Sequence, residues 1–192
     1  MENKVPLGMK DRPKQILNLV PKDVKTVLDI GSVKPSLFSE RYKTLTMDYS
    51  NADIMMDLNG LQKIPLRSKS INLVVLSQIL EHLFEFENLI AEAKRISNKY
   101  ILVGLPNEFT IDNRIKFLFG VPPSLKGYDK NGHKYLFDIQ SAEELIQLFF
   151  KGYLKKYFLF GVTGGRYLPL ATRRILARFI PGLFAAQIYY LI

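Results

Sequence analysis

Cysteine is absent from this chain of 192 residues. Its absence excludes disulfides, thiolate metal sites and a cysteine nucleophile, and it is consistent with the cytoplasmic localisation that we expect. No run of about 18 uncharged apolar residues occurs either, so we expect no membrane-spanning helix. The segment 1–10 has no apolar run behind its basic residues, and we therefore do not expect a secretory signal. Internal repeats are also absent, and the length of 192 residues predicts a single domain over residues 1–192.

Acidic residues are missing from the last quarter of the chain. The last one is Glu144, and the basic residues that follow account for most of the net charge of +9. These residues are Lys151, Lys155, Lys156, Arg166, Arg173, Arg174 and Arg178. Such a region suits an anionic partner, such as a membrane surface, a phosphorylated substrate or RNA. The alternative is a solvated basic face without a partner.

The clearest functional signal is a buried strand that runs into a glycine turn over residues 26–32. Its apolar residues are β-prone, Asp29 lies near its end, and Gly31 follows where the backbone must turn sharply. A second strand pattern over 44–47 ends in Asp48, roughly twenty residues further on, at the spacing of a ribose-binding carboxylate in α/β folds. Ligands in open parallel sheets bind beyond the carboxyl ends of the strands, so we expect a cofactor site here.

Strand and helix patterns alternate along the chain. We expect strands at 26–30, 44–47, 52–56, 71–76, 100–105, 153–160 and 187–192. We expect helices at 11–20, within 32–43, and at 85–97, 112–118, 141–150 and 170–180, the fifth opened by a capping box at Ser141–Glu144. This alternation predicts an α/β protein with a Rossmann-like, mostly parallel sheet and helices on both faces. Residues 106–138 form a substrate-side insertion in this scheme, and residues 161–182 a basic helical insertion before the last strand.

The order of these motifs resembles the class I S-adenosylmethionine-dependent methyltransferases, most closely the broad type 11 group. The resemblance extends over about residues 24–192 and rests on Val27–Gly31, Met47-Asp48, Asp57–Asn59, the strand 71–76 with Ser77–His82, and Val103–Asn107. The segments Gly132–Lys134, 141–150 and Leu183–Gln187 resemble methyltransferases of polysaccharide and glycolipid biosynthesis. The resemblance implies a seven-stranded sheet whose last strand is antiparallel. It also implies S-adenosyl-L-methionine as cofactor and methyl transfer to a small-molecule or lipid-linked sugar acceptor.

The resemblance further implies a role for each matched residue. Asp29 and Gly31 would lie beside the methionine end of the cofactor, and Asp48 would accept hydrogen bonds from the ribose hydroxyls. Asp57 and Leu58 would flank the adenine, and Ser77 would face the reacting methyl group. The alternative for Asp29 is a cap on the turn after its strand, and for Asp57 it is a plain turn.

Two positions depart from the family pattern. Val33 stands where a second glycine is common, and a Cβ there could crowd the cofactor. Asn72 replaces the aspartate that usually begins the fourth strand. These departures motivate one alternative function, a non-catalytic binding or scaffold protein. The basic C-terminal region motivates another, an RNA methyltransferase, which ranks lower because no separate RNA-binding domain is present, so we do not expect a nucleic-acid partner.

Both histidines of the chain are candidate catalytic residues. His133 lies in a polar, glycine-flanked loop and could bind substrate or take a proton from a hydroxyl acceptor, the alternative being an exposed loop residue. His82 could serve as a base, the alternative being a helix-terminal structural residue. Asn107 follows a central strand and could bind substrate, the alternative being a turn residue after Pro106.

No metal site is expected from the sequence. In some related enzymes a Glu-x-x-Glu-His run binds a divalent metal, and Glu81-His82 matches its end. Gln78, however, occupies the first position of that run, and a neutral amide is a poorer ligand for a hard cation than a carboxylate.

The helix expected at 170–180 has arginines on one arc and apolar residues on the other. Residues 166–180 could therefore make a peripheral membrane contact. The alternative is a helix that packs its apolar arc on the core and turns its arginines to water. The sequence leaves the oligomeric state open.

Overall fold

The computed structural model describes residues 12–60, 63–121, 132–159 and 168–192. Its strands are β1 (Thr26–Ile30), β2 (Lys43–Asp48), β3 (Ile54–Met55), β4 (Ile71–Ser77), β5 (Ser97–Pro106), β6 (Lys155–Leu159) and β7 (Gln187–Leu191). Its helices are α2 (Arg12–Leu17), α3 (Glu87–Ile96), α4 (Ile111–Leu118), α5 (Ile139–Phe150), α6 (Leu170–Phe179) and α7 (Pro181–Phe184), with a 3-10 turn, η1 (Leu80–His82). None of the helices described here combines the length and the apolar character needed to cross a membrane.

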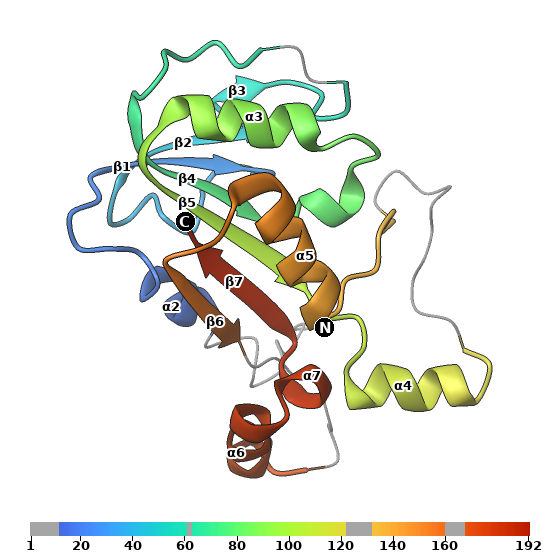
Figure 1. The fold of residues 1–192 in the computed structure, drawn as a ribbon. Coiled ribbons are helices and arrows are strands. Elements are labelled where there is room, and N and C mark those ends of the chain that lie inside the picture. Colours follow the sequence, from blue (N-terminus) through green and yellow to red (C-terminus); the bar gives the residue numbers. More distant parts are fainter. Residues whose placement is uncertain (1–11, 61–62, 122–131, 160–167) are drawn as a thin grey trace, which may run out of the picture.

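The strands form one seven-stranded sheet in the order β3-β2-β1-β4-β5-β7-β6 (Figure 1). Strands β1 to β5 pair in parallel, and β7 runs antiparallel to both of its neighbours, β5 and β6. The expected fold class, with a mostly parallel sheet and an antiparallel last strand, is therefore confirmed.

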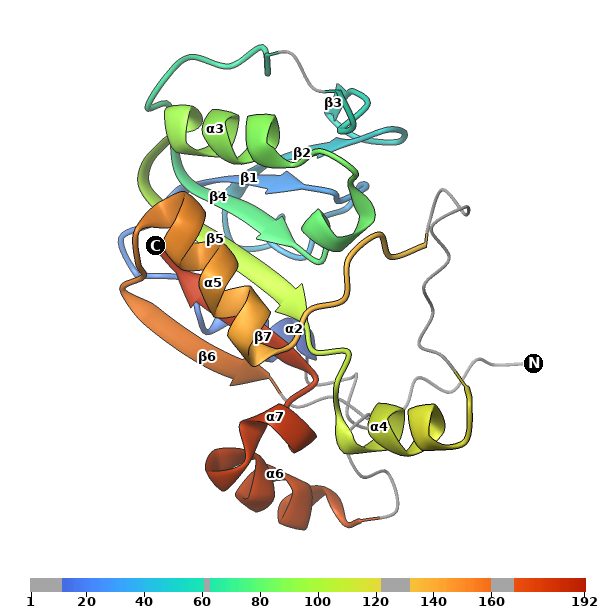
Figure 2. The same ribbon diagram turned by 45° about the vertical axis from the view of Figure 1, so that its right-hand side comes forward.

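Alternate residues of the strands face opposite sides of the sheet, as the period of two requires. In β1, Leu28 and Ile30 join the core beneath α3 and α5, whereas Val27 joins a second core that includes Ile16 of α2. The sheet is thus covered on both faces, with α3 and α5 on one side and α2 on the other (Figures 1 and 2). Asp29, between Leu28 and Ile30, faces the side of α2, and this orientation directs a carboxylate toward the end of that helix.

The strand register brings the carboxyl ends of β1, β2, β4 and β5 to one edge of the sheet. Ile30 is level with Met47 and with Leu76, and Ser77 is level with Gly104. The residues that follow these positions therefore emerge together at the carboxyl edge. Helix α4 and the segment 132–138 extend beyond this same edge (Figure 2).

Two local expectations were wrong. Residues 32–42 form turns rather than a helix. Pro35 has no N–H to donate, and the hydroxyl of Ser36 accepts the amide N–H of Phe38 at 3.1 Å, so local contacts replace a helical ladder. Helix α5 is capped by Asp138 rather than by Ser141: the Asp138 carboxylate accepts the Ser141 amide at 2.8 Å, and the Ser141 hydroxyl accepts the Asp138 amide at 2.9 Å.

Candidate functional site

A pocket of about 380 Å³, the first pocket, opens at the carboxyl end of β1. Its lining comes from α2, from the turn after β1, from the 37–38 turn and from the end of β4. The residues are Arg12, Pro13, Ile16, Asp29, Gly31, Ser32, Leu37, Phe38 and Ser77. Three of the predicted cofactor residues, Asp29, Gly31 and Ser77, thus line one pocket.

Gly31 makes the turn that shapes this pocket. Its φ of +80° lies in the left-handed region, and a Cβ there would lie 2.9 Å from the side chain of Ile79. Its amide N–H donates to the carbonyl of Met47 at 2.7 Å, which ties the turn to β2. Glycine is therefore required at this position both for its backbone conformation and for the close approach of Ile79.

Asp29 and Ser77 are two polar residues that line the first pocket. Asp29 is only 5% exposed, and its carboxylate accepts the hydroxyl of Ser36 at 2.6 Å. Burial raises the pKa of Asp29, and hydrogen bonds from Ser36 and Ser32 oppose that rise. The hydroxyls of Ser77 and Tyr189 are 2.6 Å apart, so the antiparallel strand β7 fixes the rotamer of Ser77.

A second pocket of about 300 Å³ shares Gly31 with the first. Its lining includes the three remaining predicted cofactor residues, Asp48, Asp57 and Leu58. The other lining residues are Tyr49, Asn59, Gln78, Ile79, His82 and Leu83. Asp48 is half-buried, and its carboxylate accepts the amide N–H of Tyr49 at 2.7 Å. All six residues predicted to bind the cofactor therefore line two pockets that meet at one glycine.

Asp57 also makes the plain turn that was its alternative role. Its carboxylate accepts the amide N–H of Asn59 at 2.9 Å, and the side-chain carbonyl of Asn59 accepts the amide of Phe84 at 2.9 Å. The turn is thus joined to the segment after β4. Leu58 is 6% exposed and belongs to the core beneath α3, so the turn is anchored from below as well.

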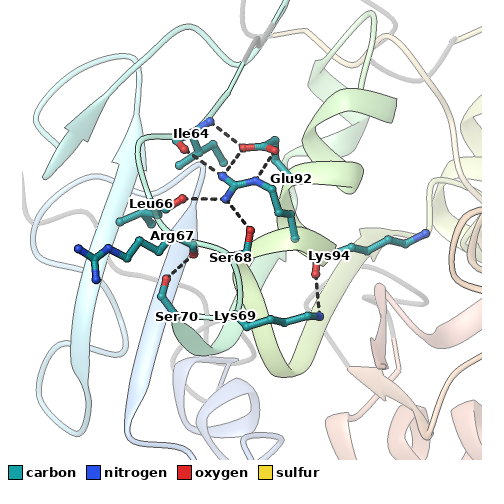
Figure 3. A network of polar contacts seen from close by, with 9 residues as sticks. Ile64, Leu66, Arg67, Ser68, Lys69, Ser70, Glu92 and Lys94 are labelled. Atoms are coloured by element: carbon teal, nitrogen blue, oxygen red, sulfur yellow. Dashed lines mark hydrogen bonds and ion pairs between the residues drawn. The ribbon is translucent and has the colours of Figure 1, made fainter.

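Figure 3 shows the hydrogen bonds and ion pairs that join residues 64–70 to helix α3. The guanidinium of Arg95 donates to the carbonyls of Ile64 and Leu66 at 3.0 and 2.8 Å, and it pairs with Glu92 at 2.6 Å. Glu92 in turn accepts the amide of Ile64 at 2.8 Å. The hydrogen bonds from Arg95 lower the pKa of Glu92. Helix α3 therefore anchors residues 64–68, the segment that leads from the second pocket back to β4.

The loop after Gly31 is fixed by an ion pair that the sequence did not suggest. Lys34 lies 2.5 Å from the carboxylate of Asp53, which also accepts the amide and the hydroxyl of Thr46 at 2.9 and 3.0 Å. The ammonium of Lys34 is the main cause that lowers the pKa of Asp53 to about 2. Val33, between the turn and this ion pair, is 46% exposed and lines neither pocket.

Asn72 lies at the amino end of β4, away from the pockets. Its side-chain carbonyl accepts the amides of Lys25 and Thr26 at 2.9 and 3.2 Å. The Asn72 side chain, which departs from the family pattern, therefore joins β4 to the start of β1 and lines neither pocket.

The two histidines meet beside the second pocket. Their rings are perpendicular, with centroids 4.7 Å apart. His82 ends η1, and the Nδ1 atom of His133 lies 2.9 Å from a carboxylate oxygen of Glu108. Neighbouring Glu81 is 1% exposed, and burial is the main cause that raises its pKa to about 7, with a further contribution from the negative charge of Glu108. His133 is thus half-buried and oriented by a carboxylate rather than an exposed loop residue.

Asn107 is 4% exposed and makes contacts typical of a structural residue. Its amide donates to the carbonyls of Gly182 and Ala185 at 3.1 and 2.8 Å, and its carbonyl accepts the amide of Phe109 at 3.1 Å. These contacts join the end of β5 to α7 and favour the turn role over substrate binding.

Arg12, Glu108 and the burial of Glu81 beside the histidines were missed in the sequence analysis. Arg12 belongs to a helix far from any motif, and only the tertiary structure brings it to the first pocket. Glu108 follows Asn107 directly, so its place after β5 was an available signal. The histidine pair had no signal, because its members are about fifty residues apart in the sequence.

The basic arc expected in 166–180 lies partly outside the described residues. This applies to Arg166, to the link 161–165 and to the side chains of Arg173, Arg174 and Arg178. Helix α6 itself is present over Leu170–Phe179, and Ile175, Phe179 and Ile180 are exposed.

No protein-family model matches this chain, and no curated protein matches it. Solved structures do. An S-adenosylmethionine-dependent methyltransferase from Archaeoglobus fulgidus aligns with 95% of this chain and 91% of its own length, at 17% identity and a TM-score of 0.59. Another from Thermotoga maritima aligns over 95% and 87%, at 15% identity and a TM-score of 0.60.

A phosphoethanolamine N-methyltransferase of Haemonchus contortus, solved with S-adenosylhomocysteine and phosphomonomethylethanolamine, aligns with 94% of this chain and 52% of its own length, at 12% identity and a TM-score of 0.53. At these identities the comparisons establish the architecture alone. The chain therefore has the fold of the S-adenosylmethionine-dependent methyltransferases, with its predicted cofactor residues gathered where strands β1, β2 and β4 end.

Proposed function

We propose that this protein binds S-adenosyl-L-methionine and transfers its methyl group to a small-molecule or lipid-linked sugar acceptor. The observation that carries the proposal is the pair of pockets that meet at Gly31. The first has a cation and hydrogen-bonding side chains suited to the amino-acid end of the cofactor. The second has Asp48 for the two ribose hydroxyls and Leu58 for a flat apolar base.

The first pocket suits the methionine end because it offers groups of both charges. Arg12 is the complement of a carboxylate, and Asp29 is the complement of an ammonium group. A cofactor that extends from these residues past Gly31, which both pockets share, to Asp48 would bring its sulfonium near Ser77 of the first pocket. The fold of the solved methyltransferases, one of which holds S-adenosylhomocysteine, supports this assignment.

Methyl transfer depends on the alignment of the acceptor with the methyl group and needs no covalent intermediate with the protein. The acceptor oxygen attacks the sulfonium methyl in line, so that a C–O bond forms while the C–S bond breaks, and S-adenosylhomocysteine leaves as a neutral thioether. The proton of a hydroxyl acceptor passes to an imidazole. We assign this role to His133, which Glu108 orients through Nδ1, with His82 as the other candidate.

A lipid-linked acceptor is supported by exposed apolar side chains around the carboxyl edge of the sheet. In α4 and just beyond it, Leu118 and Phe119 are 81% and 77% exposed, and Phe179 ends α6 at 79%. Peripheral contact with a bilayer would cover such side chains. Vesicle co-sedimentation tests this part: we expect Leu118→Ser with Phe119→Ser to lower the bound fraction, and unchanged binding would refute the contact.

Titration calorimetry with S-adenosylmethionine and S-adenosylhomocysteine tests the central proposal. We expect micromolar binding of both ligands. Absence of binding at millimolar ligand would refute it and would favour the scaffold alternative. RNA retention at low salt, lost steeply as salt rises, would instead favour an RNA substrate.

A further inference from the structure

The histidine cluster, which we define as Glu81, His82 and His133, combines groups that can ligate a metal. One ligand atom from each residue lies within 4.8 Å of the other two. The chain has only these two histidines, and both are in the cluster. It lies next to the second pocket, because His82 also lines that pocket.

Backbone hydrogen bonds hold the two halves of the cluster together. The amide N–H of Lys134 donates to the carbonyl of Glu81 at 2.6 Å, and the amide of Tyr135 approaches the same oxygen at 3.4 Å. The hydroxyl of Tyr135 donates to the carbonyl of Phe84 at 2.8 Å. Hydrogen bonds therefore hold residues 134–135, and with them His133, against the segment 81–84. Because the two imidazoles are brought together by main-chain contacts, the arrangement does not depend on their own interaction.

Glu81 supplies an observation that points to a cation. Its side chain is buried, and its Oε2 atom has no hydrogen-bond partner in the described part of the chain. A carboxylate oxygen buried without a partner is costly, and a fold retains one where something else compensates its charge. A cation bound between Glu81 and the two imidazoles would do so.

His133 has the second contact that metal-binding histidines usually make. Its Nδ1 atom lies 2.9 Å from Oε1 of Glu108, which leaves Nε2 as the nitrogen that can bind a metal. Glu108 is itself held, since the side-chain amide of Asn113 donates to its backbone carbonyl at 2.8 Å. A carboxylate on the far nitrogen fixes the tautomer and the ring orientation of a metal ligand.

We infer that Glu81, His82 and His133 form a site for a divalent transition-metal ion such as Zn²⁺, Mn²⁺ or Co²⁺. Two imidazoles and one carboxylate favour these ions over Mg²⁺ and Ca²⁺, which prefer oxygen ligands. Ligand bonds of about 2.0–2.2 Å place the ligand atoms of a tetrahedral site roughly 3.4 Å apart, so the cluster, whose ligand atoms lie within 4.8 Å of one another, needs to contract by up to about 1.4 Å.

Three protein ligands leave coordination positions open, as in catalytic metal sites. Beside the second pocket, an ion held here would orient and polarise an oxygen of the acceptor. This use of the ion rests on the proposed function, and in the metal-bound form His133 acts as a ligand rather than as a base. Binding of the ion itself does not depend on that function. The prediction of no metal site considered only the run that begins at Gln78, whose side chain instead accepts a hydrogen bond from Gln187 at 2.9 Å.

The test is a Co²⁺ titration of the full chain, with any purification tag removed and metals stripped by chelation. Visible absorption reports the ligand field, and calorimetry measures Zn²⁺ binding on the same protein. We expect one ion per chain. No binding of either ion at millimolar concentration would overturn the inference.

Variants locate the ion. Glu81→Gln and His133→Gln should each weaken binding at least tenfold, and Glu108→Gln about tenfold through the loss of its contact with His133. Glu144→Gln, which changes an exposed carboxylate elsewhere, should bind as the wild type does. Wild-type affinity in both Glu81→Gln and His133→Gln would overturn the site.

If a variant does not fold, ¹⁵N NMR of the wild-type imidazoles decides, because the two histidines give the only ring signals. Both rings must shift when Zn²⁺ binds, and unshifted rings would overturn the inference. None of these measurements requires S-adenosylmethionine, so failure of the metal site and failure of the proposed function are distinguishable.

Discussion

Replacement of Asp48 by alanine should separate cofactor binding from folding. The carboxylate accepts one hydrogen bond within the protein, from the adjacent amide of Tyr49, and the residue is half-buried at the end of β2. Losing that local contact should lower the free energy of unfolding by no more than about 1 kcal/mol, which corresponds to roughly 2–4 °C in Tm for a chain of this size.

The effect on affinity should be much larger. A hydrogen bond from a hydroxyl to a carboxylate contributes about 1.5–3 kcal/mol. Losing even one of the two expected ribose contacts therefore weakens binding roughly tenfold to a hundredfold. Calorimetry with S-adenosylhomocysteine measures this change, and Asp48→Asn should fall between the wild type and Asp48→Ala, since an amide retains one acceptor oxygen.

Asp53 provides the matched control, in the segment that joins β2 to β3. Its carboxylate is used within the protein, by Lys34 and by both the amide and the hydroxyl of Thr46. Asp53→Ala should therefore lower Tm more than Asp48→Ala does, while weakening the cofactor less. Unchanged affinity in Asp48→Ala, or a loss of Tm that accounts for its weaker binding, would refute the reasoning.

Three further changes test the packing, the pH response and the anchored loop. Gly104→Ala would place a Cβ against the ring of Tyr189, so chemical denaturation should show that the free energy of unfolding falls by about 1–3 kcal/mol, and wild-type stability would contradict the close approach. The pKa of Asp53 is about 2 in the folded protein and 3.8 ordinarily, so its carboxylate stabilises the fold above pH 3.8 and this contribution is lost as the pH falls toward 2. The Tm of the wild type should therefore fall more than that of Asp53→Asn over this pH range. Parallel curves of Tm against pH would contradict the ion pair. Arg95→Ala should lower the free energy of unfolding by about 1–2 kcal/mol, because the carbonyls of Ile64 and Leu66 lose their donor. Replacing the exposed Arg67 of the same loop by alanine should change it by no more than about 0.5 kcal/mol.

The gathering of the candidate cofactor residues at one edge of the sheet could be predicted because it depends on local signals. Asp29, Asp48 and Ser77 each lie at the end of an apolar β-prone run, and parallel pairing places such ends at one edge whatever the details of packing. The strand pattern therefore predicts both which polar residues lie at this edge and that they lie close together. The sequence order of strands and helices gave the fold for the same reason.

The meeting of the two predicted histidines could not be predicted because it depends on long-range contacts. His133 reaches His82 through the hydrogen bond from the Lys134 amide to the Glu81 carbonyl, and no period in residues 106–138 encodes that pairing. The burial of Glu81 was equally hidden, since a glutamate beside a histidine at the end of a strand is ordinarily exposed. Likewise, α5 is capped by Asp138 and not, as predicted, by Ser141, because the side chains of these two residues each accept the other's backbone amide.

The two departures from the family pattern do not weaken the site in the way that the sequence suggested. Crowding by Val33 would require its side chain to point at the cofactor, but the ion pair between Lys34 and Asp53 holds the loop so that Val33 is exposed. The one glycine that the turn requires by its φ, Gly31, is present. Asn72 keeps two backbone hydrogen bonds with its carbonyl oxygen, which an aspartate could make equally well. Neither substitution therefore argues for a scaffold that has lost its cofactor, and that alternative now depends on the outcome of the binding measurement alone.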